Sequence, residues 1–135
     1  MDKILLVDDD IVVRTVTRKI VEKTIPGVTV FCSDCVKHAY ESLILNNFSL
    51  LITDILMLDG KGTDLATTIR GDSKLYHLPI ILMSSIIDED NEIVSMVPNP
   101  DATSFLSKPL DPRELEGKIN VCLNYWKNHK DSKRA

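Results

Sequence analysis

Four of the five short apolar stretches in this 135-residue chain end in residues that could handle a phosphoryl group. Three consecutive aspartates occupy positions 8–10, directly after the first stretch, and Asp54 closes the third. Ser84 follows the fourth stretch and Lys108 follows the fifth. If the stretches are parallel strands, their carboxyl ends meet at one edge of a sheet, which would bring these side chains together.

The chemistry of this set is that of a metal-assisted phosphoryl transfer. Carboxylates that share one edge repel each other unless a cation lies among them, and oxygen ligands without histidine suit a hard ion, Mg²⁺ or Mn²⁺. Lys108 supplies a positive charge for a phosphoryl oxygen, and the hydroxyl of Ser84 can donate a hydrogen bond to another. Because an aspartate can act as the nucleophile, the residues indicate Mg²⁺-assisted phosphorylation of an aspartate.

Each of these residues alone has a simpler explanation. An aspartate after a strand is most often the N-cap of the next helix, and Asp10, directly before Ile11, fits that role. A lysine before a proline, as in Lys108–Pro109, is most often part of a loop. The coincidence of compatible groups after four strands, rather than any one of them, favours a functional site.

The apolar stretches are continuous rather than alternating, which is typical of strands covered on both faces. They lie at 4–7, 28–31, 50–52, 80–83 and 105–106. Segments with helical spacing separate them, and the longest runs from Leu115 to Trp126 after an Asp111–Pro112 start signal. Five successive βα units predict an α/β fold, a doubly wound five-stranded parallel sheet with helices on both faces and the flavodoxin-like order 2-1-3-4-5.

Composition places the chain among ordinary globular proteins. Its 44% hydrophobic and 27% charged residues and its length fit one domain that needs no disulfides. No apolar run approaches the roughly 20 residues of a membrane span, and the start of the chain has no signal-peptide pattern. A net charge of −4 without a basic stripe argues against direct nucleic-acid binding, and three cysteines favour a reducing cytoplasm.

The strand-end residues and their neighbours resemble the receiver domain of two-component response regulators, from about Asp2 to Trp126. The resemblance lies in the segments 3–10, 50–57, 62–70, 79–84 and 105–109. It implies a receiver domain over residues 1–127 and a short polar tail over 128–135. Each motif alone is weak, whereas together they are specific.

The resemblance implies a role in metal binding or phosphorylation for four residues. Asp54 would be the phosphoacceptor and also a metal ligand. Asp9 would bind Mg²⁺ directly, and Asp8 would bind it largely through water. Leu56 would give the metal its backbone carbonyl.

The resemblance also implies how the domain receives and transmits a signal. A histidine kinase or a histidine phosphotransfer protein would donate the phosphoryl group. Lys108, in cis peptide linkage to Pro109, and Ser84 would assist the transfer, and Ser84 with Phe105 would form the switch. The switch would change the face made by residues 88–97, the fifth strand and the last helix. This face would control a downstream protein target or an output domain, or it would form a phosphorylation-dependent dimer. Apart from its own phosphorylation and dephosphorylation, such a domain is not an enzyme.

The chain departs from the family pattern in the loop after the phosphoacceptor. Leu58 stands where the family usually has proline, and Gly60 stands two residues further on. Gly60 and Gly62 predict a looser loop than is usual, because glycine populates more backbone conformations than other residues. A further departure is Asp101, where the family usually has glycine before the fifth strand. None of these departures touches the phosphorylation groups.

Two other functions are open on the sequence alone. The run 8–10 formally fits the Asp-x-Asp motif of haloacid-dehalogenase-type phosphatases, which would make Asp8 the nucleophile and Asp10 the acid, but Asp54 would then have no role. A receiver-like module that only binds partners, without phosphorylation, is expected to lack some of Asp9, Asp54 and Lys108. All three are present.

The pair Cys32 and Cys35 has the C-x-x-C spacing of redox and zinc motifs. A second cysteine pair or a histidine partner of the kind found in zinc motifs is not recognisable, so we interpret the two cysteines as ordinary small residues. The three histidines, His38, His77 and His129, are scattered and are interpreted as surface or local hydrogen-bonding residues.

Overall fold

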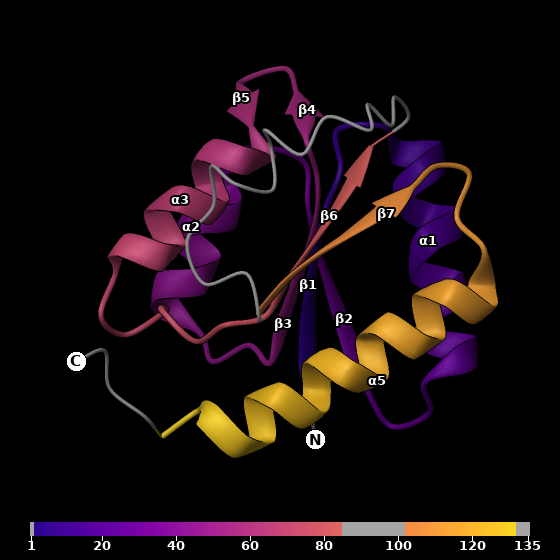
Figure 1. Ribbon diagram of the computed structural model, residues 1–135. Coiled ribbons are helices and arrows are strands. Elements are labelled where there is room, and N and C mark those ends of the chain that lie inside the picture. Colours follow the sequence, from indigo (N-terminus) through magenta and orange to yellow (C-terminus); the bar gives the residue numbers. More distant parts are fainter. Residues whose placement is uncertain (1, 85–101, 132–135) are drawn as a thin grey trace.

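A five-stranded parallel sheet forms the centre of the computed structural model, which describes residues 2–84 and 102–131 (Figure 1). The strands lie in the order β2-β1-β3-β6-β7, so the predicted order of the five main strands is confirmed. Two further, very short strands pair antiparallel with each other after β3. The bounds are Lys3–Val7 for β1, Thr29–Ser33 for β2, Leu50–Asp54 for β3, Leu56–Met57 for β4, Gly60–Lys61 for β5, Ile80–Ser84 for β6 and Thr103–Ser107 for β7.

Helices cover both faces of the sheet, as the sequence predicts (Figure 1). The helices α1 and α5 pack on one face, and α2 and α3 pack on the other. Their bounds are Ile11–Thr24 for α1, Val36–Leu45 for α2, Gly62–Gly71 for α3 and Pro112–His129 for α5. The segment 88–97 and Asp101 lie outside the described residues. None of the helices in the described ranges is long and apolar enough to cross a membrane.

The strands are continuous apolar runs because alternate residues enter two different cores. In β1, Leu5 and Val7 join the core beneath α2 and α3, whereas Ile4 and Leu6 join the core beneath α1 and α5. All of them are at most 1% exposed. A strand that is buried on both faces leaves room for polar side chains only at its ends, and Asp8 lies at such an end.

Aspartate caps start α1 and α5, the two helices that share one face of the sheet. The carboxylate of Asp10 accepts hydrogen bonds from the amides of Val12 and Val13, at 2.9 and 3.2 Å, and so caps α1. Asp111 accepts from the amide of Arg113 at 2.9 Å, and α5 begins with a proline. Both caps agree with the sequence-based prediction, and they fix where the chain leaves the edge of the sheet.

The last helix is longer than expected. It continues through His129, past the domain boundary expected at residue 127. The ring of His129 stacks on the ring of Tyr125 with centroids 4.0 Å apart, and its Nδ1 lies 2.8 Å from the carbonyl oxygen of Tyr125. These local contacts extend the helix into a segment whose polar composition did not indicate it.

A buried arginine joins the end of α3 to the segments that start β6 and β7. Arg70 is 1% exposed, and its guanidinium donates hydrogen bonds to four acceptors. These acceptors are the carbonyl oxygens of Tyr76, Leu78 and Ala102 and the hydroxyl of Thr103. Burial lowers the pKa of Arg70 to about 10, so the group stays charged at neutral pH. Arg70 therefore ties together the amino-terminal ends of β6 and β7, at the end of the sheet opposite the aspartates.

Replacing Arg70 by methionine removes these hydrogen bonds but keeps an unbranched apolar stem. We expect Arg70→Met to lower the free energy of unfolding by about 3–5 kcal/mol, because several buried oxygens lose their donor. Urea unfolding followed by circular dichroism measures the change. Arg18→Met is the matched control, because Arg18 pairs with Glu22 on the exposed surface of α1 and should cost about 0–1 kcal/mol. Equal effects of the two substitutions would contradict the role of Arg70.

Candidate functional site

The candidate site lies at the carboxyl ends of the strands, at the upper edge of the sheet in Figure 1. Asp8 and Asp9 follow β1, Asp54 is the last residue of β3, and Lys108 follows β7. The strands β1 and β3 are neighbours in the sheet, whereas β6 separates β3 from β7. The long side chain of Lys108 therefore has to reach across one strand to meet the aspartates.

The ammonium group of Lys108 lies between two carboxylates. Its Nζ is 2.9 Å from Oδ2 of Asp8 and 2.8 Å from Oδ2 of Asp54. The side chains are largely withdrawn from water, with 1% of Asp8, 15% of Asp54 and 16% of Lys108 exposed. Burial alone would lower the pKa of Lys108, but the hydrogen bonds and charges of Asp54 and Asp8 together raise it above its ordinary value. The lysine is therefore a fixed positive charge.

Three carboxylates form an oxygen-only cluster beside this lysine. Oxygen atoms of Asp8, Asp9 and Asp54 all lie within 4.8 Å of one another. Such a donor set fits a hard divalent cation such as Mg²⁺. Asp8 uses Oδ1 to accept from the amide of Asp10, at 2.9 Å, and Oδ2 to accept from Lys108. Because both of its oxygens are engaged at 2.9 Å, Asp8 is less suited to direct coordination than Asp9, whose carboxylate accepts from the amide of Leu58 through Oδ2.

The loop after Asp54 is held close to the end of the strand. Leu56–Met57 and Gly60–Lys61 pair as β4 and β5, and the amide of Gly62 donates to the carbonyl oxygen of Ile55 at 2.7 Å. A Cβ atom on Gly62 would overlap the carbonyl oxygen of Asp54, so only glycine fits. The prediction of a looser loop is therefore wrong at Gly62, where glycine permits a close approach of two backbone segments.

The turn between β4 and β5 connects the site to the start of α2. The amide of Leu58 donates to Oδ2 of Asp9 at 2.9 Å. The next residue, Asp59, accepts from the amides of Val36 and Lys37 at 3.0 and 3.2 Å, and these hydrogen bonds hold the pKa of Asp59 below its ordinary value. Asp59 was not predicted, because the amides that it caps are 23 and 22 residues away and no local pattern signals the contact.

The two switch candidates lie on the neighbouring strands β6 and β7. Ser84 ends β6 beside Ser107, and its carbonyl oxygen accepts from the amide of Lys108 at 2.8 Å. Phe105 is half-buried and packs against the core beneath α2 and α3. The peptide bond from Lys108 to Pro109 is cis, as the resemblance implies. The roles of Ser84 and Phe105 in a switch stay predictions.

Two other residues singled out from the sequence have different surroundings. Leu56 starts β4, where its amide lies 3.4 Å from Oδ1 of Asp54, and its role as a carbonyl ligand stays a prediction. The carboxylate of Asp10 is engaged at the start of α1, where it caps the amides of Val12 and Val13. A carboxylate committed to a helix cap is poorly placed to act as the acid of a dehalogenase-type phosphatase.

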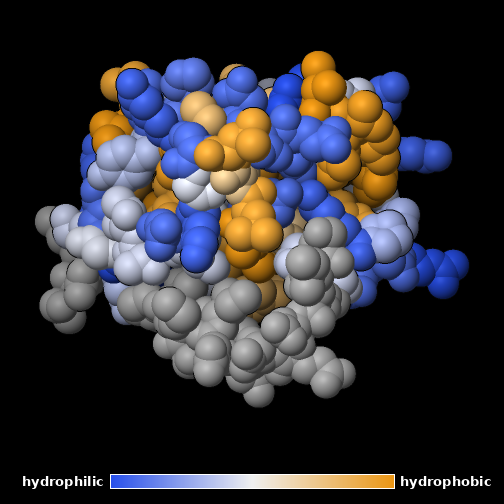
Figure 2. Space-filling model, turned by 90° about the horizontal axis from the view of Figure 1, so that it is seen from above, coloured by the Kyte–Doolittle hydropathy of each residue, from blue (hydrophilic) through white to orange (hydrophobic). Residues whose placement is uncertain are grey.

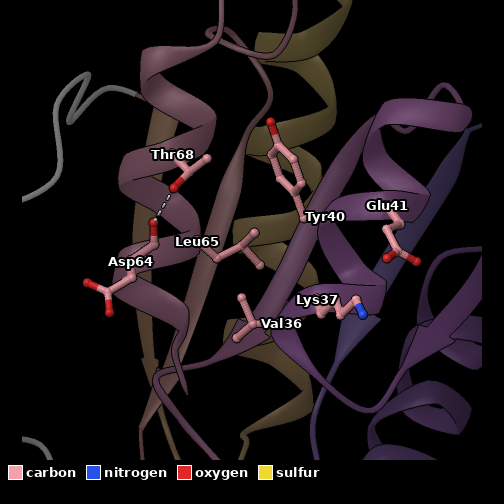
Figure 3. A pocket seen from close by; sticks show the side chains of 7 residues that line it. All are labelled: Val36, Lys37, Tyr40, Glu41, Asp64, Leu65 and Thr68. Atoms are coloured by element: carbon pink, nitrogen blue, oxygen red, sulfur yellow. Dashed lines mark hydrogen bonds between the residues drawn. The ribbon is translucent and has the colours of Figure 1, made fainter. Parts of the chain in front are cut away.

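A shallow hollow between α2 and α3 shares none of its lining residues with this site (Figure 3). Val36 and Leu65 approach each other across it from the two helices. Glu41 and Asp64 lie on opposite sides of the hollow, and their carboxylates point away from each other. The hollow therefore does not bring two carboxylates together.

Comparison with known proteins points to one family. The family model of the response regulator receiver domain matches residues 4–120. Over 122 residues the chain is 31% identical to the transcriptional regulatory protein CrdR of Helicobacter pylori, which covers 90% of this chain and 55% of that protein. It is 32% identical over 118 residues to the two-component response regulator ORR3 of Oryza sativa, with 87% of each chain covered. The chain thus spans about half the length of CrdR but most of ORR3.

A solved structure has the same arrangement of strands and helices. The response regulator receiver protein from Pseudomonas putida is 29% identical to this chain, with a TM-score of 0.75. The match covers 88% of this chain and 95% of that one. It confirms the flavodoxin-like fold predicted from the sequence.

Gly62→Ala tests whether the loop has to stay this close to Asp54. We expect the added methyl group, which would overlap the Asp54 carbonyl oxygen, to lower the free energy of unfolding by about 1–3 kcal/mol. Chemical unfolding measures the change. The control is Gly117→Ala in α5, where nothing lies within 4 Å of an added Cβ and alanine should add roughly 0.5–1 kcal/mol of stability. A neutral or stabilising Gly62→Ala would contradict the close approach.

Lys108→Met should destabilise the fold, because two largely buried carboxylates lose the cation between them. Without divalent ions, we expect a loss of about 1–3 kcal/mol in the free energy of unfolding near neutral pH. Since folding raises the pKa of Lys108, its contribution is complete below the unfolded value of about 10.4 and is lost as the pH rises through the folded value. The difference between wild type and variant should therefore shrink above about pH 10.

The measurement is urea unfolding at a series of pH values. Lys127→Met, which removes an exposed lysine from the end of α5, serves as the control and should change stability by less than about 0.5 kcal/mol. A difference between wild type and Lys108→Met that stays the same at strongly alkaline pH would argue against the charge of Lys108 as its origin.

Proposed function

The chain belongs to the response regulator receiver domain family, and from this we propose that Asp54 accepts a phosphoryl group in a Mg²⁺-dependent reaction. The observation that carries the proposal is the ammonium group of Lys108, held 2.8 and 2.9 Å from Asp54 and Asp8 within a cluster of three carboxylates. An acceptor aspartate, a fixed positive charge and an oxygen-only cation site would then surround one phosphoryl group.

The transfer would begin with attack of a carboxylate oxygen of Asp54 on the phosphorus atom of the donor. A P–O bond forms to Asp54 while the bond from phosphorus to the donor breaks, and its electron pair leaves with the donor. Asp9, Asp54 and the carbonyl of Leu56 would hold Mg²⁺ or Mn²⁺, with Asp8 acting through water. The ion supplies charge neutralisation for the phosphoryl oxygens.

Lys108 would have to change one of its partners during this reaction. A phosphoryl group on Asp54 would take over the hydrogen bond that Oδ2 of Asp54 now accepts, while the contact of Lys108 with Asp8 persists. The hydroxyl of Ser84, at the end of the neighbouring strand β6, would donate to another phosphoryl oxygen. Both donors would thus favour the phosphorylated state.

Phosphorylation would add about −1.5 to −2 charges at Asp54 together with strong acceptor oxygens. Movement of Ser84 toward these oxygens, with Phe105 turning into the vacated space, would change the face made by residues 88–97, β7 and α5. Of this face, 88–97 lies outside the described residues. The face would control a downstream protein target or an output domain, or it would form a phosphorylation-dependent dimer.

The donor would be a histidine kinase or a histidine phosphotransfer protein that docks beside α1. Figure 2 looks onto the site edge and shows apolar surface gathered on the right, over α1. The exposed apolar residues of this helix are Ile11, Val12 and Val16, at 66%, 68% and 52% exposure. An apolar groove runs from α1 to Leu110 and has Lys108 in its lining. A protein bound in this groove would present its phosphohistidine close to Asp54.

The domain would work in the cytoplasm, bind neither membranes nor nucleic acid directly, and catalyse only its own phosphorylation and dephosphorylation. The net charge of −4 without a basic stripe supports the absence of nucleic acid among its partners. The cysteines are free thiols, as is usual in a reducing compartment. The receiver domain would occupy residues 1–127 with the end of α5, followed by a short tail.

The proposal is tested by incubating the protein with Mg²⁺ and acetyl phosphate and measuring its intact mass. We expect one added phosphoryl group in wild type and none in Asp54→Asn or without Mg²⁺, because both the acceptor and the cation are then missing. Asp64→Asn is the matched control, since Asp64 is an exposed aspartate in the first turn of α3 and should leave labelling unchanged.

The other two functions give different results in the same experiment. A label on Asp8 with steady release of phosphate would support the phosphatase and overturn the proposal. Absence of any label in wild type, together with no binding of a beryllofluoride mimic, would support a module that only binds partners.

A further inference from the structure

A second cluster of metal-ligating side chains lies at the start of α2, outside the carboxylate site. Ligand atoms of Asp34, Cys35 and His38 all lie within 4.8 Å of one another. Oδ1 of Asp34 is 3.4 Å from Nδ1 of His38. Hydrogen bonds with His38 and with the thiol of Cys35 hold the pKa of Asp34 below its ordinary value. Among residues 2–84 and 102–131, no third group of this kind occurs.

Helix geometry explains why Cys35 and His38 are neighbours. Cys35 is the N-cap of α2 and His38 follows three residues later, which is the spacing that places two side chains together in a capping box. Cys35 makes no capping hydrogen bond, because Asp59 accepts from the amides of Val36 and Lys37 instead. The helix therefore positions the thiol of Cys35 without requiring it as a cap.

The cluster is accessible to an ion from solvent. The side chains of Asp34 and His38 are 64% and 63% exposed, and Cys35 is a half-buried free thiol. Asp34 and His38 also line a polar hollow together with Arg14 and Cys32, whereas Cys35 is not among its lining residues. An incoming cation would replace the weak 3.4 Å contact between Asp34 and His38.

We propose that Asp34, Cys35 and His38 bind Zn²⁺ or a similar borderline divalent cation, with water in the fourth position. Thiolate sulfur, imidazole nitrogen and carboxylate oxygen are the ligand types of protein zinc sites, whereas Mg²⁺ prefers oxygen alone. A bond from sulfur to the metal forms as the thiol proton passes to solvent. The thiolate and the carboxylate of Asp34 would then balance the two positive charges of the ion.

In this site Cys35 would share the metal with Asp34 and His38, and the C-x-x-C spacing did not indicate this set of ligands. The other cysteine of that pair, Cys32, is exposed at the end of β2 and contacts Arg18 of α1. The ligand set is therefore the N-cap cysteine of α2, the aspartate before it and the histidine three residues after it. It differs in its donor atoms from the carboxylate cluster around Asp54, so each site would select a different class of cation.

The test is a titration of the reduced full chain with Co²⁺ in excess Mg²⁺, which keeps the oxygen-only site saturated. Co²⁺ bound to a thiolate gives a charge-transfer absorption in the near ultraviolet that oxygen ligands do not produce. We expect this band to saturate at one Co²⁺ per chain and to disappear when Zn²⁺ is added. Cys35→Ser should abolish the band, and His38→Gln should weaken Co²⁺ binding at least roughly tenfold.

Two matched variants separate ligand loss from other effects. Serine is a preferred N-cap residue, so Cys35→Ser should leave the thermal unfolding of the domain unchanged or improved. Cys32→Ser removes the other thiol of the pair and should leave the band unchanged, as should Asp54→Asn. A wild type without the band, a band that survives in Cys35→Ser, or an equal loss in Cys32→Ser would each overturn the assignment, without affecting the phosphoacceptor proposal.

Discussion

Electrostatic repulsion among three carboxylates is the constraint on which the site depends. Asp8, Asp9 and Asp54 are held within 4.8 Å of one another, and Lys108 supplies the positive charge that makes this arrangement tolerable. Three formal negative charges and one positive charge leave −2, which matches a divalent cation. Only β6 lies between β3 and β7 in the sheet, so the side chain of Lys108 is long enough to reach the aspartates. The strand order therefore makes the charge balance of the site possible.

The main chain around Asp54 is held more firmly than its side chain. The amide of Ile55 donates to the carbonyl of Met83 at 2.9 Å, and Gly62 lies against the carbonyl of Asp54. The carboxylate of Asp54, in contrast, has Lys108 as its strong partner, at 2.8 Å. The proposed phosphorylation of Asp54 would therefore exchange a side-chain contact while the strand end stays in place.

Much of the fold and the centre of the site could be predicted, for identifiable reasons. Strands buried on both faces must be continuously apolar, and the carboxyl ends of parallel strands must meet, so Asp8, Asp54 and Lys108 could be expected to converge. The contacts of Asp59 and Arg70 could not be predicted in this way. Asp59 caps backbone amides up to 23 residues away, and three of the four acceptors of Arg70 are backbone carbonyls up to 32 residues away. A backbone amide or carbonyl has no signature in the sequence. The hairpin of β4 and β5 was missed because two-residue strands carry no periodicity.

The turn between β4 and β5 contacts Asp9 on one side and the start of α2 on the other, so it links the two proposed cation sites. Leu58 donates one hydrogen bond to Asp9, whereas its neighbour Asp59 accepts two from the first amides of α2. A cation that draws Asp9 away competes with a single hydrogen bond, but a shift of the turn would also remove the cap of α2, at a cost of about 1 kcal/mol. Rotating the Asp9 side chain therefore costs less free energy than shifting the turn. The start of α2 would then keep its geometry when the acceptor site is loaded, and the cluster at Cys35 and His38 would bind its ion independently of the state of Asp54.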